Sequence, residues 1–334
     1  WLRGGFALVN PHAELLPLAE RYASIRIFSA PAVLLTYAIV GWFIGRQNTL
    51  WPMLIMVVTN VTNIGLDILL IIGLGLNSEG AAYATLISEY LGCALALWVV
   101  WRQLPKRPDS QLYRQLSCLA DYRQLLRSNK DLFLRTIALL FSFAFFTAMG
   151  DKLGSTTLAA NTLMIQLIML AAFAMDGFAF AAEGLAGNSL GGRDLQGFYA
   201  ATRRCALWCG VSAALVSLTF ALVHVPLFAL LTNIPEVRSV MLHHWGWLVL
   251  LPLIAAPSYL LDGVFIGSAE TRYMMTTMLL STLCVYLPLW LLTRDWGNHG
   301  LWFAFTAFNG ARGIGLYYYY RKLSNNHSWL QPVD

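Results

Sequence analysis

Long apolar runs constrain this chain more than any other feature of its sequence. Stretches of roughly 20 apolar residues, the length at which a helix spans a bilayer, follow one another with mostly short polar breaks. Inside lipid the backbone must satisfy its own hydrogen bonds, so each stretch is expected to be a helix. We predict an all-α polytopic membrane protein with about nine spans, near residues 25–46, 50–74, 80–101, 132–150, 156–188, 199–223, 243–267, 273–292 and 298–319.

Composition and charge agree with this class. Apolar residues make up 58% of the chain and charged residues 12%, whereas soluble domains have about 45–50% and about 25%. The net charge of +5 comes from basic residues that lie mainly in the loops, so it reflects membrane topology and no nucleic-acid partner is expected. The five cysteines lack the spacing of a zinc site or a disulfide framework.

One polar stretch divides the chain. Residues 105–131 are rich in Arg, Lys, Gln and Asp, and their positive charge places them on the cytoplasmic side. We therefore predict a partial first lobe at 1–104, a cytoplasmic linker at 105–131, a second lobe at 132–322 and a C-terminal tail at 323–334.

A short internal repeat relates the two lobes. Gly41-Trp42-Phe43-Ile44-Gly45 recurs as Gly263-Val264-Phe265-Ile266-Gly267, an offset of 222 residues. Each copy ends a predicted span and precedes two more, in the same order. Both first spans run in the same direction, as in the parallel halves of several transporter folds. Chance remains the alternative, since the match is short and apolar.

Acidic residues within the spans are the candidate functional groups, because ionisable groups in lipid are costly and usually mark function. Asp176 and Glu183 lie seven residues apart, on one helix face. Asp262 is expected at a similar depth on a parallel helix, and the three could surround a proton or cation site. Alternatively, each caps a backbone kink or pairs with Arg312. The full acidic set outnumbers Arg312, the one base we place inside the membrane, and indicates an interior of carboxylates rather than fixed ion pairs: Asp67, Glu89, Asp176, Glu183 and Asp262.

Other polar residues are candidates for lining a cavity. Asn60, Asn63 and Asp67 form a stripe at spacings of three and four, which interhelical hydrogen bonding explains equally well. The remaining cavity-lining candidates are isolated in the sequence: Asn161, Gln166, Met175 and Tyr259.

Enzyme motifs are missing from the sequence. No phosphate-binding loop is present, and the adjacent His243 and His244 lack the helical spacing of a zinc protease. We expect no catalytic residue, no metal and no cofactor other than a coupling proton or sodium ion.

The chain resembles the multidrug and toxic compound extrusion (MATE) family, and within it the DNA-damage-inducible (DinF) branch. The resemblance covers essentially the whole chain and rests on these segments in this order: Gly41–Gly45, Asn63–Asp67, Glu79–Thr85, Asp176–Ala179 with Glu183, Gly192–Asp194 and Leu261–Gly267.

The resemblance implies twelve helices in two six-helix lobes, of which this chain would hold helices four to twelve as an N-terminally truncated form. Such proteins exchange organic cations and drugs for protons or sodium by alternating access. Asp262 matches an acidic residue that some members carry on helix ten for cation coupling. Their partner acid on helix seven has no counterpart, because residues 132–150 hold no carboxylate.

We therefore predict a secondary antiporter for organic cations or drug-like molecules, a multi-pass monomer of a bacterial inner membrane. A lipid-linked oligosaccharide flippase of the same superfamily is the alternative, and it should have a basic central cavity that holds pyrophosphate. A membrane receptor or enzyme would leave the repeat unexplained.

Overall fold

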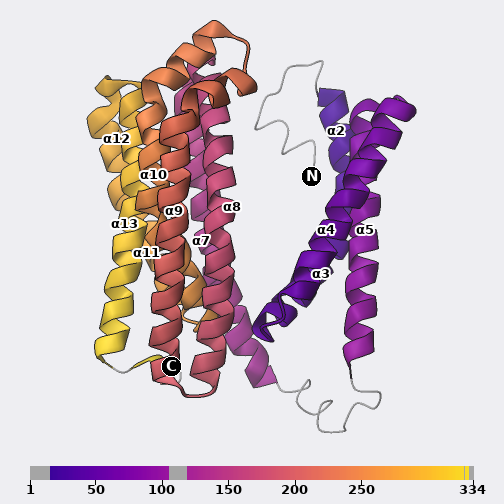
Figure 1. Cartoon of the computed structure of the whole chain (residues 1–334), viewed down its shortest axis with the longest axis vertical. Helices are drawn as coiled ribbons and strands as arrows, with labels where there is room; N and C mark the ends of the chain where they lie inside the picture. The colour runs from indigo at the N-terminus through magenta and orange to yellow at the C-terminus, as the bar shows by residue number, and fades with distance from the viewer. Residues whose placement is uncertain (1–15, 105–118, 327, 331–334) are drawn as a thin grey trace. The chain divides into compact units, whose positions relative to one another are not determined.

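The structure, a computed structural model, describes residues 16–104, 119–326 and 328–330, which are almost entirely helical and contain no strand (Figure 1). The main helices are α2 (Leu16–Arg26), α3 (Ala30–Gly45), α4 (Leu50–Asp67), α5 (Asn77–Gln103), α7 (Leu119–Lys152), α8 (Ser155–Gly191), α9 (Leu195–Leu231), α10 (Pro235–Gly267), α11 (Thr271–Leu280), α12 (Leu287–Thr293) and α13 (Asn298–Asn325). Two π-helices, Ile68–Gly73 and Ser281–Tyr286, continue α4 and α11. Parts of the predicted linker and tail, residues 105–118, 327 and 331–334, lie outside the described residues.

Eight helical segments in the described ranges are long and apolar enough to cross a membrane. The ninth predicted span, 298–319, falls in α13, which has the length but carries polar residues such as His299, Asn309 and Arg312. Three predicted spans were clearly too short, since α7, α9 and α10 extend beyond the apolar runs at 132–150, 199–223 and 243–267. Helical hydrogen bonding continues past the apolar segment until a stop signal, which for α9 is the extended residue Thr232.

The chain divides into two compact units, residues 1–116 and 117–334. In the first unit α5 packs against α2, α3 and α4. Its buried apolar core is small: Ile39, Phe43, Ile55, Ala96 and Val99. Most other apolar side chains of α3 and α4 are exposed, as expected of helices that face lipid.

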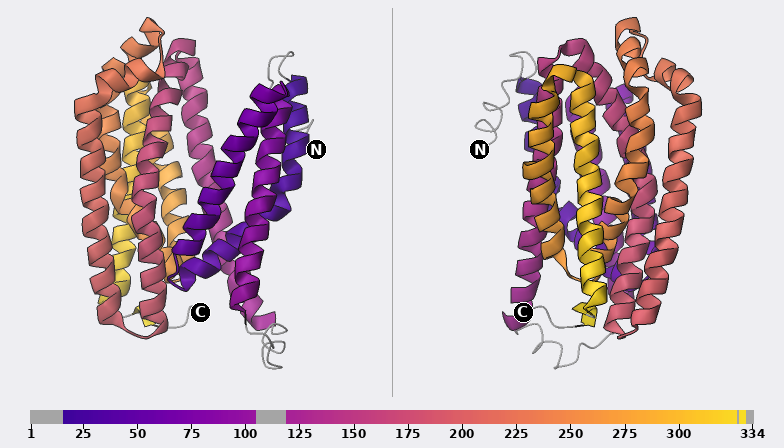
Figure 2. Two further views of the ribbon diagram at one scale, coloured as in Figure 1. Left: turned by 45° about the vertical axis from the view of Figure 1, so that its right-hand side comes forward. Right: turned by 90° about the vertical axis from the view of Figure 1, so that its left-hand side faces the viewer.

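In the second unit α10 is the central helix, and it packs against α8, α9 and α13. Figure 2 shows α13 in yellow beside the orange α11 and α12. Aromatic side chains fill much of the core: the ring centroids of Phe146 and Trp302 lie 4.9 Å apart, and those of Phe146 and Phe305 lie 5.0 Å apart. Burial on several sides makes α10 the helix that positions groups in the interior.

Glycines allow α10 to approach α8 closely. A Cβ atom on Gly263 would meet the carbonyl oxygen of Ala179, and one on Gly267 would meet that of Glu183. Small residues at helix interfaces let backbones come together in lipid, where packing rather than the hydrophobic effect holds helices. The second copy of the repeated segment is therefore a helix-packing surface, and it sets the depth of Asp262 relative to α8.

The internal repeat is also visible in backbone geometry. After the first copy, Gln47 has φ 57°, and the backbone N–H of Asn48 donates to the Phe43 carbonyl at 3.0 Å. After the second, Ala269 has φ 60°, and the N–H of Glu270 donates to the Phe265 carbonyl at 3.0 Å. Both pairs of positions differ by the same 222 residues, so the two segments end their helices with the same left-handed turn.

Candidate binding cavity

One cavity of about 320 Å³ lies within the second unit, between α7, α8, α10 and α13. Its walls are largely apolar and include the aromatic rings of Phe143, Phe173, Phe305 and Phe308. Three acidic and two basic residues also line it: Asp176, Glu183, Asp262, Arg135 and Arg312. An apolar cavity with a few convergent polar groups is typical of a small-molecule site.

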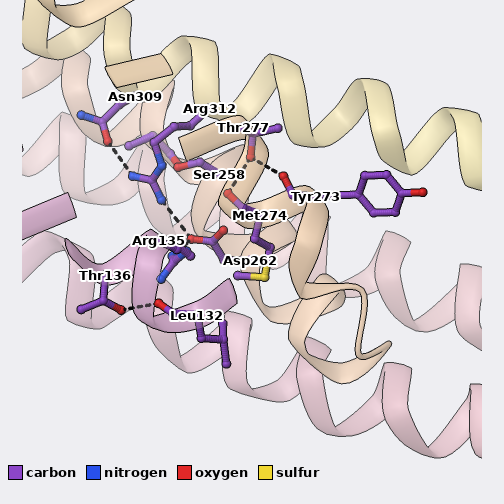
Figure 3. A network of polar contacts seen from close by, with 11 residues as sticks. Leu132, Arg135, Thr136, Ser258, Asp262, Tyr273, Met274, Thr277, Asn309 and Arg312 are labelled. Carbon is purple, nitrogen blue, oxygen red and sulfur yellow. Dashed lines mark hydrogen bonds and ion pairs between the residues drawn. The ribbon is translucent and has the colours of Figure 1, made fainter. Parts of the chain in front are cut away.

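Asp262 is the centre of the charged network (Figure 3). Arg312 Nη2 donates to its Oδ2 at 2.9 Å, and Arg135 pairs with the same oxygen. Figure 3 shows both guanidinium groups directed at this carboxylate, one from α13 and one from α7. Asn309 extends the network, because its Oδ1 accepts from Arg312 Nη1 at 3.2 Å. Three helices are thus joined through one carboxylate.

Asp176 and Glu183 line the same cavity from α8 and are half-buried. Within the described part of the chain neither carboxylate forms an ion pair, although both share the cavity lining with Asp262 and Arg135. The structure therefore brings together the three acidic residues that the sequence placed around one site. Two other cavity-lining candidates, Met175 and Tyr259, also lie on its wall.

The expectation of an interior without fixed ion pairs was wrong. Besides Arg312, α7 contributes Arg135, which we did not identify from the sequence. The predicted span of 132–150 held Arg135 near its start, whereas the structure places this residue of α7 on the cavity wall. Glu89 is paired too, since Arg26 Nη1 donates to its Oε2 at 2.7 Å. The sequence signal that could have indicated Arg135 as a partner of Asp262 was an arginine inside a predicted span.

Asn161 and Gln166 do not line the cavity. Asn161 is buried, and its amide exchanges hydrogen bonds with Asn298 at 2.7 Å and 3.0 Å and accepts one from Trp302 Nε1 at 2.9 Å. Asn161 therefore joins α8 to α13 by hydrogen bonds, which is a structural role common for amide side chains between membrane helices. Gln166 is exposed on α8.

The polar stripe on α4 lies in the first unit. Asn63 Nδ2 donates to Thr85 Oγ1 at 3.2 Å, and with its amide reversed it would reach Asp67 Oδ2 at 3.3 Å. Asp67 Oδ1 is buried and has no hydrogen-bond partner among the described residues. Asn60 is exposed. Asn63, Asp67 and Thr85 thus form a small polar site, which Asn60 does not join.

Comparison with known proteins identifies the family. Residues 6–69 and 132–291 match the family model described as MatE. The chain belongs to the MatE family. Because the match covers more than half of the chain and includes helices of both units, the resemblance seen in the sequence is confirmed.

Relatives support the DinF-like branch of this family. The chain is 35% identical to DNA damage-inducible protein F of Escherichia coli (strain K12) over 324 residues, 97% of this chain and 70% of that protein. It is also 32% identical to Protein DETOXIFICATION 42 of Arabidopsis thaliana over 155 residues, 46% of this chain and 29% of that protein.

Solved structures share the fold. A mutant of the Vibrio cholerae MATE transporter VcmN matches with a TM-score of 0.86 and 23% identity, over 99% of this chain and 75% of that one. Relatives and fold are those of membrane transporters rather than enzymes. With its apolar helices, this MatE protein is a multi-pass inner-membrane transporter of bacterial type.

Proposed function

We propose that this MatE protein exports cationic, drug-like molecules in exchange for protons or sodium ions, by alternating access. The observation that supports this proposal best is the second-unit cavity, where aromatic walls surround two carboxylates that form no ion pair with a described residue, Asp176 and Glu183. Aromatic faces and carboxylates both attract organic cations. We propose no cofactor besides the coupling ion, and a monomeric transporter, because the described lining of this cavity comes from a single chain.

Competition between cargo and coupling ion would drive the exchange. A proton or sodium ion that neutralises Asp176 or Glu183 removes the charge that holds a cation, so the two bind in alternation. Exposure of the cavity to one side of the membrane at a time then converts an ion gradient into export. Asp67, whose buried Oδ1 has no hydrogen-bond partner among the described residues, is a second candidate for ion coupling within the first unit.

A direct test uses ethidium transport in inverted membrane vesicles that contain the protein produced from its complete gene. We expect ethidium uptake into the vesicles to require an imposed proton or sodium gradient, and to fall at least about tenfold when both carboxylates are neutralised (Asp176→Asn with Glu183→Gln). Glu236→Gln is the matched control, because Glu236 is exposed at the start of α10 and does not line the cavity. Gradient-independent movement of ethidium would contradict antiport.

The flippase alternative has one observation in its favour, the two arginines in the cavity. A pyrophosphate group would need these guanidinium groups, but both are engaged by Asp262. Reconstituted protein that moves a fluorescent lipid pyrophosphate between leaflets, and that does not move ethidium, would favour the flippase.

A further inference from the structure

We infer that Arg135 is a tethered cation that occupies part of the acidic cavity and thereby restricts the cargo to molecules with one positive charge. This inference rests on the proposed function and assigns a specificity-determining role to a residue that the transport mechanism above does not use. It depends on a difference between the two arginines that contact Asp262.

Arg312 is fixed in the protein interior. Its side chain is 5% exposed, donates to both Asp262 and Asn309, and lies 5.7 Å from the ring of Phe308. A single guanidinium supplies one full positive charge and a charge-assisted hydrogen bond, so Arg312 alone balances the negative charge of Asp262. Asp262 therefore needs no second counter-charge.

Arg135 is held less completely. Its side chain is 17% exposed, and its only ion pair among the described residues is with Asp262, which Arg312 already compensates. Its Nε is buried and has no hydrogen-bond partner in the described part of the chain. The Arg135 side chain lines the same cavity as Asp176 and Glu183. Arg135 thus places one extra positive charge beside the carboxylates that would hold a cationic cargo.

The charge of the cavity follows from its lining. With Asp176, Glu183 and Asp262 ionised and both arginines charged, three negative and two positive charges leave one net negative charge. A cargo with one positive charge neutralises this cavity, whereas a cargo with two leaves a surplus positive charge in a low-dielectric site, which is unfavourable. Removal of the Arg135 charge leaves two net negative charges and should favour a dication.

Ethidium and propidium test this inference, because they share one aromatic ring system and carry one and two positive charges. Purified full-length protein in lipid nanodiscs is titrated with each dye at pH 7, and the ratio of the two dissociation constants is compared between variants. We expect wild-type protein to prefer ethidium, and Arg135→Gln to shift the ratio towards propidium by at least about tenfold, which is 1.4 kcal/mol.

Two further variants separate charge from packing. Arg135→Lys keeps the charge and should keep the wild-type ratio, while Arg272→Gln removes an exposed positive charge from the start of α11, outside the cavity, and should also leave the ratio unchanged. An unchanged ratio in folded Arg135→Gln protein overturns the inference.

If Arg135→Gln does not fold, the wild-type protein decides the question, because a cavity with one net negative charge should bind ethidium about tenfold more tightly than propidium. Equal or tighter binding of propidium overturns the inference. Wild-type protein that neither binds nor transports ethidium would contradict the proposed function as well, whereas ethidium transport combined with an unshifted Arg135→Gln ratio contradicts the role of Arg135 alone.

Discussion

Asp262 shows how strongly one buried carboxylate can depend on its partners. Its side chain is 10% exposed and is contacted by two guanidinium groups from helices far apart in the sequence. Loss of one partner of a buried ion pair is costly because the remaining charge stays desolvated. In this protein a change at Asp262 would leave two arginines uncompensated, so its effects on stability and on transport cannot be separated without a control.

For this single residue, we expect Asp262→Asn to lower the free energy of unfolding by about 3–5 kcal/mol. Asp176→Asn, which breaks no ion pair in the described residues, should lower it by less than about 1 kcal/mol. Urea unfolding of the purified protein in detergent, followed by tryptophan fluorescence, measures both. Equal losses in the two variants would mean that the arginine pairs contribute nothing specific to stability.

Among the helices, the contact between α8 and α10 is sensitive to a single added methyl group at either of two glycines. Gly263 and Gly267 bring α10 onto the backbone of α8, and the same contact carries Asp262 to the wall of the cavity. The equivalent glycines of the first copy, Gly41 and Gly45, meet no described atom within 4 Å at their Cβ positions. The same sequence segment therefore serves helix packing in one unit, whereas in the other it makes no such contact with a described atom.

We expect Gly263→Ala to destabilise the protein by about 1–3 kcal/mol, because the new methyl group would overlap the Ala179 carbonyl oxygen and force the helices apart. Gly246→Ala, on the same helix, should stay within about 1 kcal/mol of the parent, since a Cβ there meets no described atom within 4 Å. Thermal unfolding of both variants in detergent tests this pair. Equal stability of the two would contradict the close approach of α8 and α10.

For the molecule as a whole, the distribution of Lys and Arg predicts that the linker, and with it the turn between α8 and α9, faces the cytoplasm. The exposed residues Gln196 and Asn233 lie at opposite ends of α9. In a cysteine-free background, Asn233→Cys should react with a membrane-impermeant maleimide in intact cells, and Gln196→Cys should react only after the cells are permeabilised. The reverse pattern would invert the orientation.

Much of the fold could be predicted because lipid leaves the backbone few options. Each apolar run had to form a helix, so every predicted span corresponds to a helix, and the errors lie at the ends, as in α7, α9 and α10. The seven-residue spacing of Asp176 and Glu183 placed both on one face of α8 for the same reason. The cavity-lining residues were harder to predict than the helices. Asn161 and Asn60 are as polar as the residues that line the cavity, yet Asn161 joins two helices and Asn60 is exposed.

The sequence by itself determined the class of protein, the helices, the two candidate lobes and the acidic residues of the cavity, because these depend on local composition and helical periodicity. Only the tertiary structure decided which charges meet. Arg135 and Asp262 lie 127 residues apart, and whether they pair depends on the rotation and depth of α7 and α10. Side-chain packing between helices fixes both quantities, and no local pattern in one sequence encodes them.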